Sequence, residues 1–237
     1  MKIHQVTDLH IPNDDAGPQF DHVRPNIVKM LSFVESDTSD LLVITGDLTM
    51  DDGSRSACEW LNSVIPDDLN TIVVPGNDDD PSVLWEVFGQ ASCMNPEFCF
   101  REQHGSHTVL FVNSHTDRLA KDQIEFIRSE ASEAPAILFI HHPPDLTSKG
   151  FMALNQPLLN HQEVAMAIQE SMVTDVFCGH YHNAVDIECN GFRLHLTPSP
   201  AFQISLQSEA FEMESFDPTI RVIELSEATV ETYLRTV

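Results

Sequence analysis

The chain has 237 residues and a formal net charge of −25 at pH 7, from 12 Lys+Arg against 37 Asp+Glu. Such an acidic surface repels the phosphates of long DNA or RNA and the face of an anionic membrane, so we expect neither as a partner. With 42% hydrophobic residue types the chain can build a large core, and we expect a single domain over residues 1–237.

The N-terminus and the cysteines favour a cytoplasmic protein. No segment reaches the roughly 18 consecutive apolar residues that a membrane span requires, and residues 1–8 lack the apolar stretch of a secretory signal. The five cysteines are odd in number and form no C-x-x-C pair, which is typical of buried thiols in a reducing compartment.

Short apolar runs alternate with longer amphipathic ones along the chain. In order, we expect strands over residues 3–6, 41–45, 71–74, 98–101, 108–112, 136–140 and 174–178, with helices over 26–36, 54–64, 122–131 and 162–170. Four more strands, 185–188, 192–197, 220–225 and 230–234, follow the last helix. The alternation predicts a largely parallel sheet covered by helices, and the strand-rich end predicts a second sheet or an antiparallel edge.

Five of the predicted strands run directly into Asp, Asn or His. The motifs that follow them are, in chain order, Asp8-Leu9-His10, Gly46-Asp47, Gly76-Asn77-Asp78, His141-His142-Pro143-Pro144 and Gly179-His180-Tyr181-His182. Because the carboxyl ends of parallel strands share one edge of a sheet, we expect these side chains to converge in the crevice outside that edge.

The residue types and their spacing suit metal binding. Asp8 and His10 are two residues apart, so in extended chain both side chains point the same way, and His180 and His182 repeat this arrangement. Glycines precede three of the motif residues and permit tight turns and close approach of the backbone. A ligand set of carboxylates, imidazoles and one amide favours manganese, iron or zinc over calcium, which prefers ligands that are all oxygen.

Each motif alone has a simpler explanation. The segments at Asp47 and Asn77 are common turns, and the segment at His141 is compatible with a rigid exposed loop. The paired histidines 180 and 182 are more specific, since two imidazoles on one face form a chelate. Five such motifs, each following a strand, are poorly explained as independent turns, so we interpret them as one site.

The order of these motifs resembles that of the calcineurin-like metallophosphoesterases, whose pattern is D-x-H, G-D, G-N-H-D/E, H and G-H-x-H. The resemblance runs from Asp8 to His182. A narrower similarity is to the bacterial class III cyclic-nucleotide phosphodiesterases and related glycerophosphodiesterases, through H-H-P-P, the T-P-S-x-x-x-Q segment at 197–203 and a P-G-x-R-like segment at 217–221. The resemblance implies an α/β fold, a four-layer α-β-β-α sandwich with two mixed sheets flanked by helices.

The resemblance also implies two divalent metal ions, manganese, iron or zinc, with Asp47 bridging them. One ion would be held by Asp8, His10, Asp47 and His182, and the other by Asp47, Asn77, His141 and His180. His141 is preferred to His142 because it stands first after its strand. His142 would instead contact the substrate or support the ligands.

Two cations that share a water lower its pKa and supply hydroxide to attack phosphorus. The charges of two divalent ions, two carboxylates, a hydroxide and a phosphodiester sum to zero, whereas a monoester leaves the centre negative. We therefore predict a small phosphodiester substrate, 3′,5′-cyclic AMP among the candidates. The motifs carry no Arg or Lys, but loop cations such as Arg55 or Lys149 leave a phosphomonoesterase or a nucleotide pyrophosphohydrolase as alternatives.

This chain departs from the family at Asp78, where the family usually has His. An ionised Asp78 would repel the substrate phosphate, whereas a protonated one could donate a proton to the leaving group. We take Asp78 and His142 as candidate catalytic residues and hypothesise that Asp78 restricts the enzyme to good leaving groups. A non-catalytic scaffold of the same fold is the remaining alternative, although all seven ligand positions are filled.

Other polar residues fit simpler roles. His4 lies within the first predicted strand, where we expect a packed histidine. The acidic pairs 14–15 and 51–52 follow ligand-bearing strands, and we expect them in solvated loops. A homodimer is compatible with the sequence.

Overall fold

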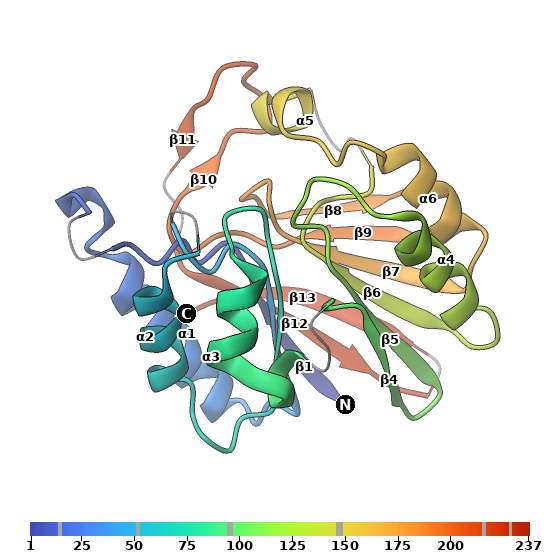
Figure 1. Ribbon diagram of the computed structural model, residues 1–237, viewed down its shortest axis with the longest axis horizontal. Helices are drawn as coiled ribbons and strands as arrows, with labels where there is room; N and C mark the ends of the chain where they lie inside the picture. Colours follow the sequence, from blue (N-terminus) through green and yellow to red (C-terminus); the bar gives the residue numbers. More distant parts are fainter. Residues whose placement is uncertain (14–15, 51–52, 94–96, 146–148, 215–216, 228) are drawn as a thin grey trace.

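Two β-sheets lie face to face in the computed structural model of this chain, and helices cover the outer face of each sheet (Figure 1). The structure describes residues 1–13, 16–50, 53–93, 97–145, 149–214, 217–227 and 229–237. The acidic pairs 14–15 and 51–52 lie outside the described residues. The predicted four-layer α-β-β-α sandwich is confirmed.

The first sheet has five strands in the order β13-β12-β1-β2-β3. Its parallel part consists of β1 (Lys2–Val6), β2 (Leu41–Thr45) and β3 (Thr71–Val74). The last two strands of the chain, β12 (Thr219–Leu225) and β13 (Val230–Thr236), pair antiparallel beside β1. Every residue of β2 and β3 is buried, which explains why both strands are apolar runs rather than alternating ones.

The second sheet has six strands in the order β4-β5-β6-β7-β9-β8. Its four central strands are parallel: β5 (His107–Val112), β6 (Ala136–Ile140), β7 (Val173–Cys178) and β9 (Arg193–Leu196). The edge strands β4 (Phe100–His104) and β8 (Val185–Glu188) are antiparallel to their neighbours. A small hairpin of β10 (Gln203–Ile204) and β11 (Met213–Glu214) stands apart from both sheets (Figure 1).

Three helices, α1 (Val23–Ser36), α2 (Arg55–Val64) and α3 (Pro81–Cys93), cover the first sheet, while α4 (Lys121–Glu130) and α6 (His161–Gln169) cover the second (Figure 1). In α1 the buried Ile27, Met30, Leu31 and Val34 recur every three or four residues, as the predicted amphipathic pattern requires. The short helices η1 (Pro18–Phe20) and α5 (Phe151–Asn155) lie in loops. Among the described residues, no helix combines the length and apolarity needed to cross a bilayer.

A single apolar cluster fills the space between the two sheets. It joins Ile3, Val43 and Val74 of the first sheet to a row of aromatic rings on the second. That row runs across four neighbouring strands, with ring centroids 4.8, 5.4 and 5.2 Å apart from Phe100 through Phe111 and Phe139 to Phe177. A core shared by both sheets is consistent with the predicted single domain over residues 1–237. The domain assignment itself stays a prediction.

The prediction of one largely parallel sheet is wrong in its pairing. The strands that precede the five motifs belong to two sheets, β1, β2 and β3 to the first and β6 and β7 to the second. The C-terminal strands divide likewise, because β8 and β9 extend the second sheet while β12 and β13 return to the first. An apolar run that marks a buried strand has the same composition in either sheet, so the sequence pattern does not reveal the partner.

Candidate metal centre

The seven candidate ligands lie together, beyond the carboxyl ends of strands from both sheets. Asp8 and His10 follow β1, Asp47 follows β2, Asn77 follows β3, His141 follows β6, and His180 and His182 follow β7. Backbone hydrogen bonds join these loops, from Asp8 N to Gly46 O (2.9 Å) and from Gly179 N to His141 O (3.1 Å). Asn77 is exposed and the other six are buried. The convergence therefore occurs where the ends of two sheets meet, rather than at one sheet edge.

One group of donors consists of Asp8, His10, Asp47 and His182, with one ligand atom from each residue within 4.8 Å of the others. His182 Nε2 lies 3.4 Å from Asp8 Oδ1, and His10 Nε2 lies 3.7 Å from Asp47 Oδ2. The two Nε2 atoms of His10 and His182 are 2.9 Å apart. These are the four residues that the resemblance implies for one ion.

A second group consists of His141, His142 and His180, again with donor atoms within 4.8 Å of one another. His141 Nε2 also lies 3.3 Å from Asp47 Oδ2 and 3.2 Å from Asn77 Oδ1. Asp47 therefore approaches donors of both groups.

His142 belongs to this second group, although the sequence interpretation placed it outside the ligands. Its Nδ1 atom is 2.9 Å from Ser114 Oγ. Its Nε2 atom lies 3.0 Å from Asp117 Oδ1 but makes no hydrogen bond by geometry among the described residues. The imidazole of His142 is thus buried with one ring nitrogen available, which makes it a further candidate donor.

Backbone carbonyls fix the orientation of three of the histidines. The accepting oxygens are those of Thr45 for His141 Nδ1 (2.8 Å), Gln156 for His180 Nε2 (2.8 Å) and Phe202 for His182 Nδ1 (3.1 Å). Because a carbonyl only accepts, the bonded nitrogen carries a proton, and in the neutral imidazole the other ring nitrogen keeps the lone pair that binds a metal. Metal-binding histidines ordinarily show this arrangement. The donor chemistry therefore fits divalent cations such as manganese, iron or zinc.

Close packing around these donors requires glycine at Gly46 and Gly179, among other positions. Gly46 has a φ of 90°, and a Cβ there would lie 2.5 Å from His141 Nδ1 and 2.6 Å from Gly76 N. A Cβ at Gly179 would overlap Thr7 Oγ1 and Asp8 Oδ2. The close backbone approach predicted from the sequence is confirmed at both glycines.

Five candidate ligands have left-handed backbone, which residues other than glycine rarely adopt. Their φ angles are 51° at Asp8, 40° at His10, 49° at Asp47, 65° at His180 and 48° at His182. The prediction that the paired ligands lie in extended chain is therefore wrong, because each motif turns sharply after its strand. Each such residue costs about 1–2 kcal/mol, and a cluster of them is typical of a functional site.

Opposite charges face one another inside this buried site. Burial raises the pKa of Asp8 to about 8, and the neighbouring charge of Asp47 adds to this shift. Burial lowers the pKa of His141, but the carboxylates of Asp47 and Asp8 outweigh it and raise that pKa to about 10. Burial and the charge of His141 lower the pKa of His180 to about 3. Buried acids and imidazoles held this close together form an environment that a cation stabilises.

Asp79 is a buried residue of the site that the sequence interpretation missed. Its Oδ1 accepts from Leu48 N (2.9 Å) and Thr49 N (3.3 Å), and its Oδ2 accepts from Gly76 N (2.9 Å). Burial, together with Asp47, raises the pKa of Asp79 to about 7. Asp79 thereby joins the loops that carry two candidate ligands. The signal was present, because the third family motif has Asp or Glu at this place.

Asp78 lies at the rim of the site, with 39% of its side chain exposed. Its backbone N–H donates to Asp47 Oδ1 (2.9 Å), and its carboxylate accepts from Asn77 Nδ2 (2.9 Å). Asp78 Oδ2 lies 3.6 Å from His10 Nδ1. The candidate catalytic carboxylate therefore adjoins candidate ligands of both ions.

The loop cations and His4 have other environments. Arg55 pairs with Glu86 and Glu59, and Lys149 is exposed. His4 is buried in β1, with Nε2 3.0 Å from Asp37 Oδ2, so its prediction as a packed histidine is confirmed.

The segments behind the narrower resemblance support the site from within the core. Ser199 Oγ donates to the carbonyl of Asp8 (2.6 Å), and Thr197 Oγ1 donates to Gln5 Oε1 (2.7 Å). The fully buried Arg221 donates from Nε to Thr197 Oγ1 (3.0 Å). Arg221 also pairs with Asp186 (2.9 Å). A continuous row of polar contacts thus runs from Arg221 to the strand that precedes Asp8.

The fold and the donor groups at the meeting ends of its two sheets define a metallophosphoesterase. The sequence profile described as calcineurin-like phosphoesterase matches residues 1–184. The chain therefore belongs to the calcineurin-like phosphoesterase family and is a phosphoric ester hydrolase.

Within that family, the chain is similar to proteins named as cyclic nucleotide phosphodiesterases. It is 30% identical over 237 residues to a "probable cyclic nucleotide phosphodiesterase" of Fibrobacter succinogenes, covering 98% of this chain and 92% of the relative. It is 25% identical over 241 residues to the "3′,5′-cyclic adenosine monophosphate phosphodiesterase CpdA" of Vibrio vulnificus, covering 95% and 85%. A dimetal phosphatase from Danio rerio shares the fold, with a TM-score of 0.71 and 10% identity over 98% of both chains.

Proposed function

We propose that this protein is a phosphodiesterase that hydrolyses a small phosphodiester, with 3′,5′-cyclic AMP as the leading candidate, at a dinuclear metal centre. The observation that carries the proposal is the position of Asp47, whose carboxylate lies 3.7 Å from His10 Nε2 and 3.3 Å from His141 Nε2. A carboxylate that lies between two groups of imidazoles is placed to bridge two metal ions. The named activities of the curated relatives support the choice of a cyclic diester.

The donors divide into two sets that share Asp47. Asp8, His10, Asp47 and His182 would hold one cation, and Asp47, Asn77, His141 and His180 the other, with manganese, iron or zinc as the ions that suit these donors. Two bound divalent cations supply a water of lowered pKa and stabilise negative charge on the phosphate oxygens. The carbonyls of Thr45, Gln156 and Phe202 hold the imidazoles in the tautomer that this role requires.

The two candidate catalytic residues have distinct tasks in this proposal. Asp78 is partly exposed at the rim, where its carboxyl group can hold a proton for the leaving oxygen. His142 is buried beside His141 and His180, with Ser114 fixing its ring, and supports the donors from the side. A diester suits the site better than a dianionic monoester, since Arg55 is already paired with Glu86 and Glu59.

A side-by-side assay tests the proposal. Metal-free protein would be loaded with manganese, iron or zinc and offered 3′,5′-cyclic AMP, 2′,3′-cyclic AMP, a glycerophosphodiester and a phosphomonoester. We expect about two equivalents of metal per chain and faster turnover of a diester than of the monoester. Asp47→Asn should lose metal and activity, whereas Asp68→Asn, at an exposed carboxylate, should keep both.

Each other outcome has a definite meaning. Preference for the monoester would replace the diesterase by a phosphomonoesterase. Metal binding without hydrolysis of any ester would indicate a scaffold of the same fold. Protein that neither retains metal nor cleaves an ester would contradict the proposal.

We also place the protein in the cytoplasm, where free thiols persist. Three cysteines that the structure describes, Cys58, Cys178 and Cys189, are free. Fractionation of cells tests this location. A homodimer stays a prediction, and sedimentation of the purified chain measures it.

A further inference from the structure

A cavity of about 440 Å³ lies beside the candidate metal centre. Three segments form its walls: the loop around η1, the segment that leads into β10, and strand β11. Its lining residues are Gln19, Phe20, His22, Ala201, Phe202, Met213 and Glu214. The volume falls within the range of small-molecule sites in proteins.

Phe202 connects this cavity to the candidate metal centre. Its ring stacks on that of His10, with centroids 5.6 Å apart, and lies 4.6 Å from the ring of His182. Its backbone oxygen accepts from His182 Nδ1. A molecule in the cavity would therefore be separated from the candidate ligands by one aromatic side chain.

The lining suits a neutral, planar ring better than a phosphate. None of the seven lining residues is Lys or Arg, and the one carboxylate is that of Glu214. Phe20 and Phe202 both line the cavity, and aromatic side chains are the groups on which a nucleobase stacks. Met213 is 58% exposed and would be covered by such a ring. A carboxylate such as Glu214 accepts from the exocyclic amino group of a base.

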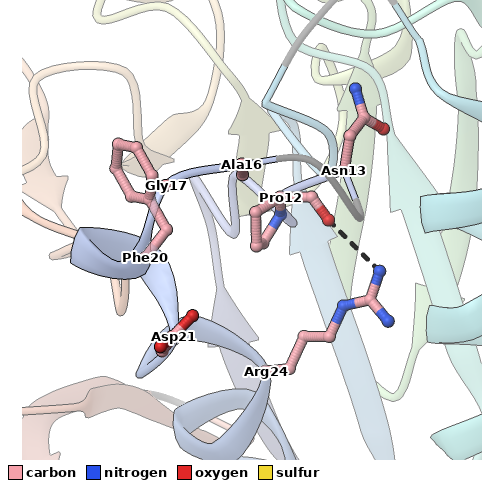
Figure 2. Close-up of a pocket in the computed structure, with 7 residues that line it drawn as sticks. All are labelled: Pro12, Asn13, Ala16, Gly17, Phe20, Asp21 and Arg24. Carbon is pink, nitrogen blue, oxygen red and sulfur yellow. Dashed lines mark hydrogen bonds between the residues drawn. The ribbon is translucent and has the colours of Figure 1, made fainter.

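The wall that carries Phe20 is held in place by its neighbours. Figure 2 shows the smaller cavity beside it, where the guanidinium of Arg24 reaches across to the carbonyl of Pro12 at 3.2 Å. Arg24 also lies over the ring of Trp60, 4.9 Å from its centroid. Across the larger cavity, His22 Nε2 donates to the carbonyl of Ala201 at 2.7 Å. The two walls are thus joined before any ligand is present.

We infer that this cavity binds the nucleobase of a cyclic nucleotide whose phosphate occupies the candidate metal centre. The inference rests on the proposed phosphodiesterase function and adds to it the site that recognises the amino-substituted heteroaromatic ring of the diester.

The test compares a cyclic nucleotide with an analogue that lacks the base. The substrates are 3′,5′-cyclic AMP and the 3′,5′-cyclic phosphate of 1-deoxyribose, and the variants are Phe20→Ala and Met213→Ala. We expect Phe20→Ala to raise KM for cyclic AMP by about 5- to 150-fold, the factor that corresponds to loss of one stacking partner. Met213→Ala should raise it less. Turnover of the base-free substrate should not change in either variant, which also shows that both are folded.

Met166→Ala is the matched control, because Met166 is 54% exposed on α6 and does not line the cavity. It should leave both substrates unaffected. Equal effects of Phe20→Ala on the two substrates, or no effect on either, would overturn the inference while the phosphodiesterase proposal stands.

If the metal-loaded native protein cleaves none of the phosphodiesters, including 2′,3′-cyclic AMP and the glycerophosphodiester, the phosphodiesterase proposal fails, and binding decides the inference separately. Calorimetry would then measure the affinity of 5′-AMP for the native protein and for Phe20→Ala. Weaker binding by Phe20→Ala supports the nucleobase site. Equal binding, or none by the native protein, refutes it.

Discussion

Replacing Gly46 with Ala would place a methyl group where the loops of the two donor groups meet. The new Cβ would lie 2.5 Å from His141 Nδ1 and 2.6 Å from Gly76 N, closer than nonbonded atoms tolerate. The first of these atoms donates to Thr45 O and the second donates to Asp79. Gly105 provides a control with the same backbone handedness, since its φ is 59° and a Cβ there would meet no atom within 4 Å.

The two substitutions differ by a calculable amount. Gly105→Ala costs only the left-handed backbone, about 1–2 kcal/mol in the free energy of unfolding. Gly46→Ala has the same backbone cost plus an overlap of about 1–3 kcal/mol, so we expect a total loss of about 2–5 kcal/mol. A displaced His141 also loses its carbonyl partner, a change that lowers metal affinity by about 10- to 100-fold.

Two measurements check this reasoning. Urea denaturation of the metal-free proteins gives the free energies of unfolding, and titration with manganese or zinc gives the affinities. Gly105→Ala should bind metal as the native protein does. If Gly46→Ala matched Gly105→Ala in both stability and metal affinity, the assigned contact between the Gly46 backbone and His141 would be refuted.

Three further predictions concern single side chains. Arg221→Met should lower the free energy of unfolding by about 1–3 kcal/mol, because the fully buried guanidinium donates to Thr197 Oγ1 and Leu196 O and its loss leaves these buried acceptors without that donor; an unchanged stability in urea denaturation would contradict the assigned role. Burial raises the pKa of Asp175, but hydrogen bonds, the largest from His195, hold it below its usual range. Its contribution to stability is therefore complete above the unfolded pKa near 3.9 and is lost as pH falls through the lower folded value, so acid titration of Asp175→Asn should give a flatter stability curve than that of the native protein. Asp78→His should raise turnover of unactivated diesters relative to activated ones, by up to about 100-fold; an unchanged ratio would remove the hypothesis that Asp78 restricts the leaving group.

Several strands were predictable, in most cases because an apolar run ends in a strong turn signal. The predicted bounds of β2, β3, β6 and β8 agree with the structure, and the motif residues after β2, β3 and β6 mark where those strands stop. The helix α3 was missed, since Gly89, with a φ of 66°, interrupts its pattern. The helix α5, Phe151–Asn155, is too short for a periodic signal. The pairing of strands that are distant in the sequence leaves no trace in local composition. The assignment of each strand to one of the two sheets therefore required the structure.

The candidate site was predictable to the extent that side chains define it. Aspartates and histidines after strands are visible in a sequence, and all seven candidate ligands lie together. The partners of three histidines are backbone carbonyls, at Thr45, Gln156 and Phe202, and every residue has one. Such partners carry no sequence signature. The cavity beside Phe202 likewise depends on how three distant segments meet.

At five candidate ligands the left-handed backbone lowers the stability of the fold, whereas the side chain at the same position supplies a metal-binding atom. Glycine at any of them would relieve about 1–2 kcal/mol of conformational energy, yet it would delete a donor atom. A homologue that is no longer selected for catalysis would thus become more stable by substitution to glycine at positions 8, 10, 47, 180 and 182. Glycine there would mark an inactive descendant more reliably than overall sequence divergence does.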